Sequence, residues 1–140
     1  MKNWVVYSLI SMFFAGLTSV IAKMGLKNVS SDTGLAIRTV TVFVFIWVNA
    51  IAFQSVKDFK NLTKTDIMFL TISGVTTTLS WIFYYKAIKI GNVSQVALID
   101  KASILITLLL SFFILNEQFS WKVGLGASFI LVGLLILTIK

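Results

Sequence analysis

Five long apolar runs dominate this chain of 140 residues. Each run is close to the about 20 residues that an α-helix needs to cross the hydrocarbon core of a bilayer. The runs are continuous rather than alternating, which favours helices over the strands of a barrel. Thr65 or Asp66 is available to cap the third of them. We therefore predict five transmembrane helices, at about residues 4–22, 35–53, 67–85, 93–115 and 123–139.

Composition supports the same fold class. Hydrophobic residues make up 58% of the chain and charged residues 12%, whereas a soluble domain carries about 25% charged residues. A single small core cannot bury so much apolar surface. The loops between the runs are short, so neighbouring helices are expected to lie antiparallel. The prediction is an all-α integral membrane protein with a single five-helix domain over residues 1–140, in which the bilayer is the main partner.

Several classes of function have little support in the residues. The chain has neither Cys nor His, so disulfides are impossible and the usual ligands of zinc or haem are missing. We expect no metal and no cofactor. An intramembrane enzyme would need a nucleophile with its base or paired carboxylates, and only Asp100 is available at depth. We therefore predict no catalytic residues and no enzymatic activity.

The net charge of +7 could suggest nucleic acid. The basic residues, however, stand singly at the ends of apolar runs, where Lys and Arg anchor helices to lipid headgroups. Nucleic-acid binding is therefore not expected.

Five spans place the two termini on opposite sides of the membrane. Leaving out Arg38 and Lys101, five lysines fall on each side: Lys2, Lys57, Lys60, Lys64 and Lys122 against Lys23, Lys27, Lys86, Lys89 and Lys140.

The positive-inside rule predicts orientation from the difference in Lys and Arg count between the two sides. Here that difference is zero, so the rule favours neither orientation. Either other factors fix a weakly determined orientation, or copies insert both ways and pair head to tail. A dual topology of this kind would produce an antiparallel homodimer.

Polar and small residues recur on one face of four of the runs. In the third run they are Ser73, Thr77, Ser80 and Tyr84, and in the fourth they are Asp100, Ser103, Thr107 and Ser111. Helix–helix packing alone can explain any one such stripe, because small and hydroxylated residues line membrane interfaces. Several stripes together, two of them with ionisable groups, favour a shared polar cavity. Four aromatic side chains could offer stacking or cation–π contacts to a solute, although aromatic belts and lipid contacts explain most such residues. They are Trp47, Trp81, Tyr84 and Tyr85.

Arg38 and the adjacent pair Asp100 and Lys101 are the ionisable groups inside the runs. Arg38 lies about one turn into the second run, and Asp100 about two turns into the fourth from the same side. An Arg38–Asp100 ion pair is geometrically reasonable. It would either fix helix register or form part of a binding site, which is the default reading of intramembrane charges. Two cations against one carboxylate favour a solute with an anionic group.

The fragments "AKMGLKNV", "AIRTV" and "SWIFYYKAIKIGNVSQVALIDKASILITLLLSFFILNEQFSW" resemble one five-helix EamA unit of the drug/metabolite transporter superfamily. The likeness covers nearly the whole chain. It implies a multi-pass export or exchange permease of the cell (inner or cytoplasmic) membrane, and one half of an inverted-repeat fold, so that two copies would assemble. Many members have a proline in the fourth helix. This chain has none, so any kink there needs another source.

The leading hypothesis is a homodimeric transporter of small polar metabolites that bear a carboxylate or are zwitterionic. Its candidate binding or gating residues are Arg38, Asp100, Lys101, Ser103, Thr107, Thr77, Ser80, Trp81 and Tyr84. The alternative is a non-transporting accessory or scaffold protein in which the ion pair serves assembly alone.

Overall fold

The computed structural model describes residues 3–53, 55–118 and 120–138. Throughout these residues every regular element is a helix. The chain divides into two compact units, Met1–Ile90 and Gly91–Lys140.

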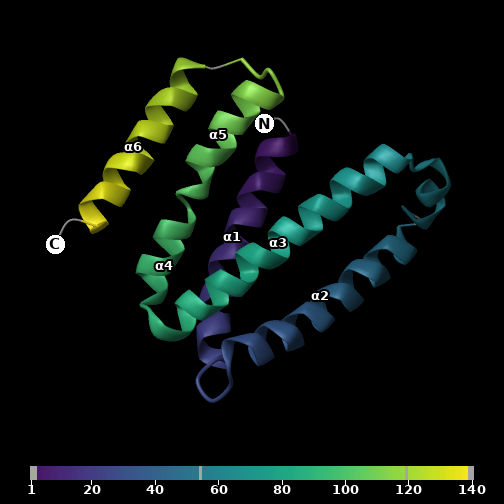
Figure 1. The fold of residues 1–140 in the computed structure, drawn as a ribbon, viewed down its shortest axis with the longest axis horizontal. Helices are drawn as coiled ribbons and strands as arrows, with labels where there is room; N and C mark the ends of the chain where they lie inside the picture. The colour runs from purple at the N-terminus through teal and green to yellow at the C-terminus, as the bar shows by residue number, and fades with distance from the viewer. Residues whose placement is uncertain (1–2, 54, 119, 139–140) are drawn as a thin grey trace. The chain divides into compact units, whose positions relative to one another are not determined.

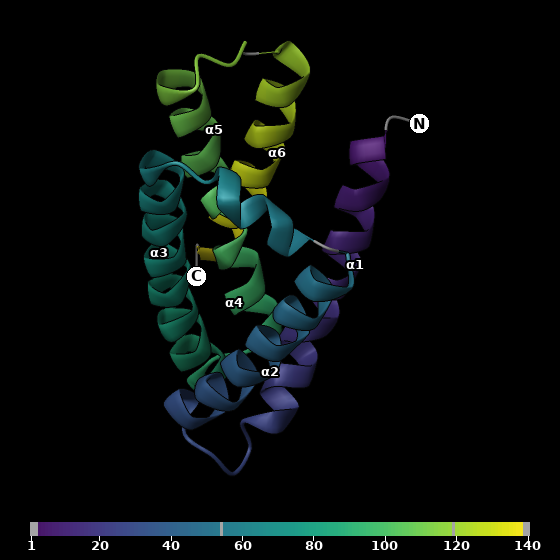
Figure 2. The same ribbon diagram turned by 90° about the vertical axis from the view of Figure 1, so that its right-hand side faces the viewer.

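The first unit contains three long helices and one short one (Figure 1). In it α2 packs along α3, α1 contacts α3, and η1 packs on α2. The short helix η1 connects the end of α2 with the start of α3 (Figure 2). The ring of Phe59 in η1 stacks on that of Trp47, with centroids 6.0 Å apart. The elements are α1 (Asn3–Gly25), α2 (Ser31–Ala52), η1 (Ser55–Asn61) and α3 (Lys64–Ile90).

Side chains cap the starts of α2 and α3. The hydroxyl of Ser30 accepts a hydrogen bond from the backbone N–H of Thr33 at 3.1 Å. Before α3, the N–H of Asp66 donates to the hydroxyl oxygen of Thr63 at 3.2 Å, and the N–H of Thr63 donates to the Asp66 carboxylate at 3.0 Å. This reciprocal arrangement is a capping box. Thr63 is therefore the capping residue, one position before the helix, and Asp66 is its partner rather than the cap itself.

Two lysines join the ends of α1 and α3. The Lys23 ammonium donates to the carbonyls of Ile88 at 2.6 Å and of Lys89 at 3.2 Å. In return the Lys89 ammonium donates to the carbonyls of Leu26 and, at 3.1 Å, of Lys27. The last carbonyls of a helix lack intrahelical partners and carry partial negative charge. Each lysine thus satisfies the carbonyl end of the other helix, and we call this arrangement the lysine clamp.

The second unit contains α4 (Val93–Asp100), α5 (Ser103–Ile114) and α6 (Trp121–Thr138). Both α4 and α5 contact α6. The run predicted as one helix over 93–115 is interrupted at Lys101 and Ala102 (Figure 1). There the N–H groups of Ala102, Ile104 and Leu105 bond to carbonyls three residues back, a tighter pattern than that of an α-helix. The break arises without a proline.

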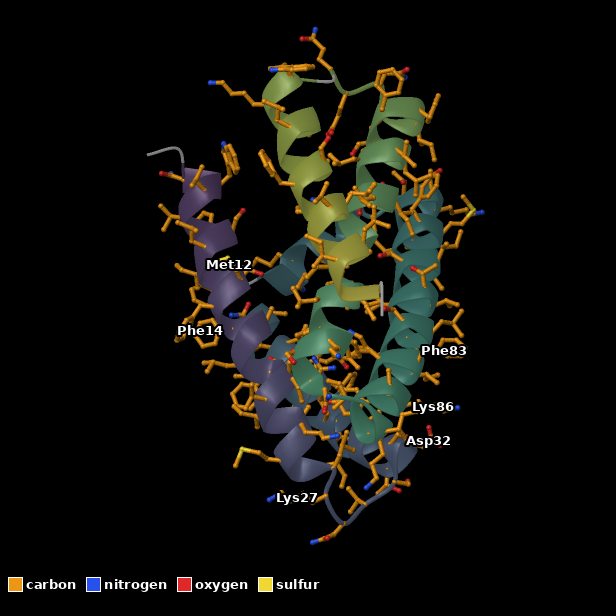
Figure 3. All side chains as sticks on the ribbon, turned by 90° about the vertical axis from the view of Figure 1, so that its left-hand side faces the viewer. Met12, Phe14, Lys27, Asp32, Phe83 and Lys86 are labelled. Carbon is orange, nitrogen blue, oxygen red and sulfur yellow. The ribbon has the colours of Figure 1, made fainter. Side chains whose placement is uncertain are left out.

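The exposed surface of the described residues is largely apolar. Of the side chains that the structure describes, four form a buried core: Leu26, Leu35, Tyr85 and Ile88. Met12 and Phe14 extend outward from α1, and Phe83 from α3 (Figure 3). Within the described ranges, four stretches are long and apolar enough to cross a membrane: α1, α2, α3 and Val93–Ile114. The fifth, Trp121–Ile136, is apolar but shorter. Such surfaces need a hydrocarbon solvent, so the chain is an all-α integral membrane protein.

Candidate functional site: an arginine-lined cavity and an interrupted helix

Arg38 is held on the aromatic face of α3. Its guanidinium carbon lies 4.1 Å from the ring centroid of Trp81 and 5.6 Å from that of Tyr85. Trp81 and Tyr85 are four residues apart, so they lie on the same side of α3. A guanidinium over an aromatic ring is attracted by the ring quadrupole, more strongly where water is excluded. The sequence predicted Trp81 as a contact for solute, and the structure places it against Arg38.

A cavity of about 450 Å³ adjoins this cation. Arg38, Tyr85 and Thr18 supply its polar groups, and aliphatic side chains form the remaining wall. Tyr85 is only 4% exposed, whereas Arg38 is half-buried. The residues that line the cavity are Thr18, Ile21, Ala22, Gly25, Leu26, Val29, Gly34, Ile37, Arg38 and Tyr85.

Among the described residues of its own unit, Arg38 has no carboxylate partner within 4.0 Å. In its own unit, the Asp66 carboxylate accepts hydrogen bonds from Thr63. The ion pair between Arg38 and Asp100 would join the two units, so it stays a prediction. The first unit therefore contains a guanidinium at membrane depth that borders a cavity. Within the described part of this unit the guanidinium contacts aromatic rings, and no anion.

Asp100 and Lys101 lie at the interruption between α4 and α5. The Lys101 ammonium is 3.7 Å from the Asp100 carboxylate, and the two side chains are 67% and 37% exposed. A second cavity, of about 630 Å³, borders the same point. Lys101, Ser103 and Thr107 contribute its polar groups. Its lining residues are Leu98, Lys101, Ser103, Ile104, Thr107, Ile130, Gly133 and Leu134.

The structure therefore brings together three of the residues predicted on the fourth helix, Lys101, Ser103 and Thr107. Asp100 does not line this cavity but lies beside it through Lys101. The Thr107 hydroxyl donates to the carbonyl of Ser103 at 3.1 Å. Ser103 and Thr107 both lie in the first turns of α5.

The predicted stripe on α3 separates into different surroundings. The hydroxyl of Tyr84 shares a hydrogen bond of 2.7 Å with that of Ser19 on α1. The Thr77 hydroxyl donates to the carbonyl of Ser73 in its own helix at 2.8 Å. Ser80 is exposed. None of Thr77, Ser80 and Tyr84 lines the Arg38 cavity.

Sequence reasoning did not mark Thr18 as a cavity residue, and it named Tyr85 only as a possible aromatic contact, without placing it among the candidate binding residues. A signal for Tyr85 was present, because its spacing of four from Trp81 places the two rings on one helical face. No comparable signal marked Thr18. Its hydroxyl donates to the carbonyl of Phe14 at 2.8 Å, as threonines in membrane helices commonly do.

Comparison with known proteins gives a consistent result. The model of the EamA-like transporter family matches residues 2–139. A protein of Sinorhizobium sp, described as "Uncharacterized transporter in cobO 3'region", is 33% identical over 138 residues, which cover 99% of this chain and 98% of that protein. No solved structure matches the chain.

Proposed function

The chain belongs to the EamA-like transporter family, and we propose that it works as a homodimeric exporter or exchanger of small polar metabolites. The proposed solutes bear a carboxylate or are zwitterionic. The observation that carries this proposal is the Arg38 guanidinium, which lines a membrane-level cavity and has no carboxylate partner among the described residues of its unit. The proposed location is the cytoplasmic membrane.

The depth of Arg38 explains why an anion is expected. Arg38 follows the start of α2 at Ser31 by seven residues, which is about 10 Å along the helix axis. A cation at this depth is costly unless it is paired or reaches water. Trp81 attracts the guanidinium but does not neutralise it. A carboxylate can do so, and the planar fork of N–H groups fits its two oxygens.

The second unit supplies the other proposed elements. Asp100 and Lys101 lie where α4 ends, and irregular backbone at membrane depth is tolerated where protein or a water-filled cavity surrounds it. In broken-helix transporters such points hold solutes or coupling ions. We assign Asp100 and Lys101 to binding or gating, with Ser103 and Thr107 along the adjoining cavity and Thr77 and Ser80 along the solute path.

Two copies are proposed because the chain resembles one five-helix unit, one half of an inverted-repeat fold, along nearly its whole length. Inverted-repeat transporters enclose a site near the bilayer midplane between two related halves. A head-to-tail pair of copies would reproduce that arrangement. The equal division of lysines between the two sides is compatible with insertion in both directions.

The test combines binding and transport. Purified protein is screened by thermal shift against glutamate, succinate, lactate and neutral amino acids, each beside its amide, since a ligand of the folded state raises apparent stability. Compounds that bind are then followed across proteoliposomes. Arg38→Ala should weaken carboxylate binding about 30-fold or more, as expected when one side of a buried charge pair is lost.

Lys86→Met is the matched control, because Lys86 is an exposed cation of the same unit that points away from α3 (Figure 3). Its binding and transport should equal those of the wild type. If Arg38→Ala and Asp100→Asn leave transport intact but reduce dimer stability, the scaffold function is correct and the transport role of these residues is wrong.

A further inference from the structure

Two adjacent tyrosines on α3 have opposite surroundings. The hydroxyl of Tyr84 is engaged by Ser19 at 2.7 Å. The hydroxyl of Tyr85 has no hydrogen-bond partner among the described residues, although Tyr85 is only 4% exposed. Tyr85 also lines the Arg38 cavity. Among the described residues no fully buried polar side-chain atom lacks a hydrogen-bond partner. The Tyr85 hydroxyl, which has none, therefore keeps some access to space outside the packed side chains, and the cavity that Tyr85 lines provides such space.

The neighbouring Arg38 guanidinium indicates which kind of ligand group the Tyr85 hydroxyl can bind. Trp81 covers the Arg38 guanidinium at 4.1 Å and does not line the cavity, whereas Arg38 and Tyr85 both do. Trp81 thus covers one flat face of the guanidinium. The N–H groups at the edge of the guanidinium remain able to donate to an acceptor. Guanidinium N–H groups and a phenolic O–H are all donors. A carboxylate, which accepts through about four lone-pair sites, matches them.

The rest of the wall is aliphatic. It consists of Ile21, Ala22, Leu26, Val29 and Ile37, with two glycines. The volume of about 450 Å³ lies within the usual range of ligand pockets, which is about 300–1,000 Å³. Such a wall offers nothing to a second charge or to hydroxyl groups, and it favours an apolar body behind the carboxylate.

We infer that Arg38 and Tyr85 together bind one carboxylate group, and that the aliphatic wall selects a monocarboxylate with an apolar body. This inference rests on the proposed function and narrows its substrate class. It also adds Tyr85 to the binding residues. Thr18 stands at the same cavity, with its hydroxyl already bonded to Phe14, so it is not assigned a role in holding the carboxylate.

The experiment measures binding of radiolabelled hexanoate to the full chain in lipid nanodiscs, after subtraction of empty nanodiscs. Hexanamide replaces the carboxylate by an uncharged amide, and succinate replaces the apolar body by a second carboxylate. The wild type should bind hexanoate at least about tenfold more tightly than either. Tyr85→Phe should weaken hexanoate binding about tenfold, as expected for one hydrogen bond to a charged group.

Tyr7→Phe is the matched control, since it removes the same hydroxyl group from an exposed tyrosine of α1 that does not line the cavity. It should change hexanoate affinity by less than about threefold. Equal weakening in both variants, or wild-type affinity in Tyr85→Phe, overturns the inference. Tyr85→Phe keeps the buried ring, and its melting temperature shows whether the fold is retained.

A second variant tests the apolar part independently. Ala22→Leu enlarges a side chain of the aliphatic wall, so it should weaken hexanoate more than succinate. If it weakens both equally, the proposed body-binding wall is wrong. The proposed function has its own readout in Arg38→Ala. If that variant loses carboxylate binding while Tyr85→Phe does not, only the present inference fails. If Arg38→Ala binds and transports as the wild type does, the proposed function itself fails.

Discussion

At the scale of single residues, the packing of α2 against the end of α1 depends on Gly34. A Cβ at Gly34 would collide with a methyl group of Leu26. Leu26 is 2% exposed, and the open space beside its side chain is the Arg38 cavity, which it lines. The absence of a side chain at position 34 therefore allows the close approach of the two segments beside the Arg38 cavity.

Gly34→Ala is expected to destabilise the protein by about 1–3 kcal/mol, as overpacking in a buried site does. The measurement is the melting temperature in detergent. Gly74→Ala is the control, because nothing lies within 4 Å of a Cβ built there and alanine is the better helix former. A melting temperature for Gly34→Ala at or above that of the wild type would show that Leu26 relocates without cost.

At the scale of elements, the lysine clamp joins α1 to α3 at one end only. Its four hydrogen bonds and the Ser19–Tyr84 bond all lie in the last turns of the two helices. In the first turns of α1, residues 3–10 are all exposed except Val5, which is half-buried. The clamp is thus the main polar attachment between these two helices within the first unit.

Lys23→Met should lower the melting temperature by a few degrees, corresponding to about 1–2 kcal/mol for hydrogen bonds from a charged donor to helix-end carbonyls. Lys86→Met keeps the same loss of charge without touching the clamp. If both variants melt at the same temperature, the clamp contributes nothing beyond net charge.

The interruption between α4 and α5 is the second feature at this scale. The i to i−3 hydrogen bonds of Ala102, Ile104 and Leu105 have poorer geometry than those of an α-helix. Backbone of this kind at membrane depth needs protein or water around it. The cavity bordered by Lys101 and Ser103 provides such a place.

Amide hydrogen exchange is expected to be faster at residues 101–105 than at residues 107–111, although both stretches belong to one apolar span. Weaker bonds and access to the cavity both favour local opening at the first stretch. Mass spectrometry of peptides from the protein in nanodiscs measures the difference. Equal protection of the two stretches would indicate that the span behaves as one continuous helix.

At the scale of the whole molecule, orientation in the membrane is the open prediction with the clearest test. Asn28 and Asn61 are both exposed, the first between α1 and α2 and the second at the end of η1. One span separates them, so they belong to opposite sides of the membrane. The chain has no Cys, and single cysteines can be introduced at each position.

If copies insert in both directions, a membrane-impermeant maleimide added to intact cells should label about half of Asn28→Cys and about half of Asn61→Cys. The equal lysine counts predict this outcome. Complete labelling of one variant and none of the other would establish a single orientation and rule out the antiparallel homodimer.

The sequence by itself determined the solvent, the fold class and the family. In hydrocarbon, a long continuous apolar run can satisfy its backbone hydrogen bonds within the run only as a helix. The order of the motifs around Arg38 and Asp100 indicated the family that the comparison then showed. These features follow from local composition and order along the chain, which need no knowledge of neighbouring helices.

Only the tertiary structure decided which side chains meet. Helical periodicity separates Tyr84 from Tyr85 by about 100°, but it does not say which of them faces α2. Packing placed Tyr85 with Arg38 and gave Tyr84 to Ser19. The interruption after Asp100 likewise could not be predicted from a proline, because the sequence contains none. The reciprocal bonds of Lys23 and Lys89 needed two helix ends brought together, because each lysine and its partners are 62 to 66 residues apart along the chain.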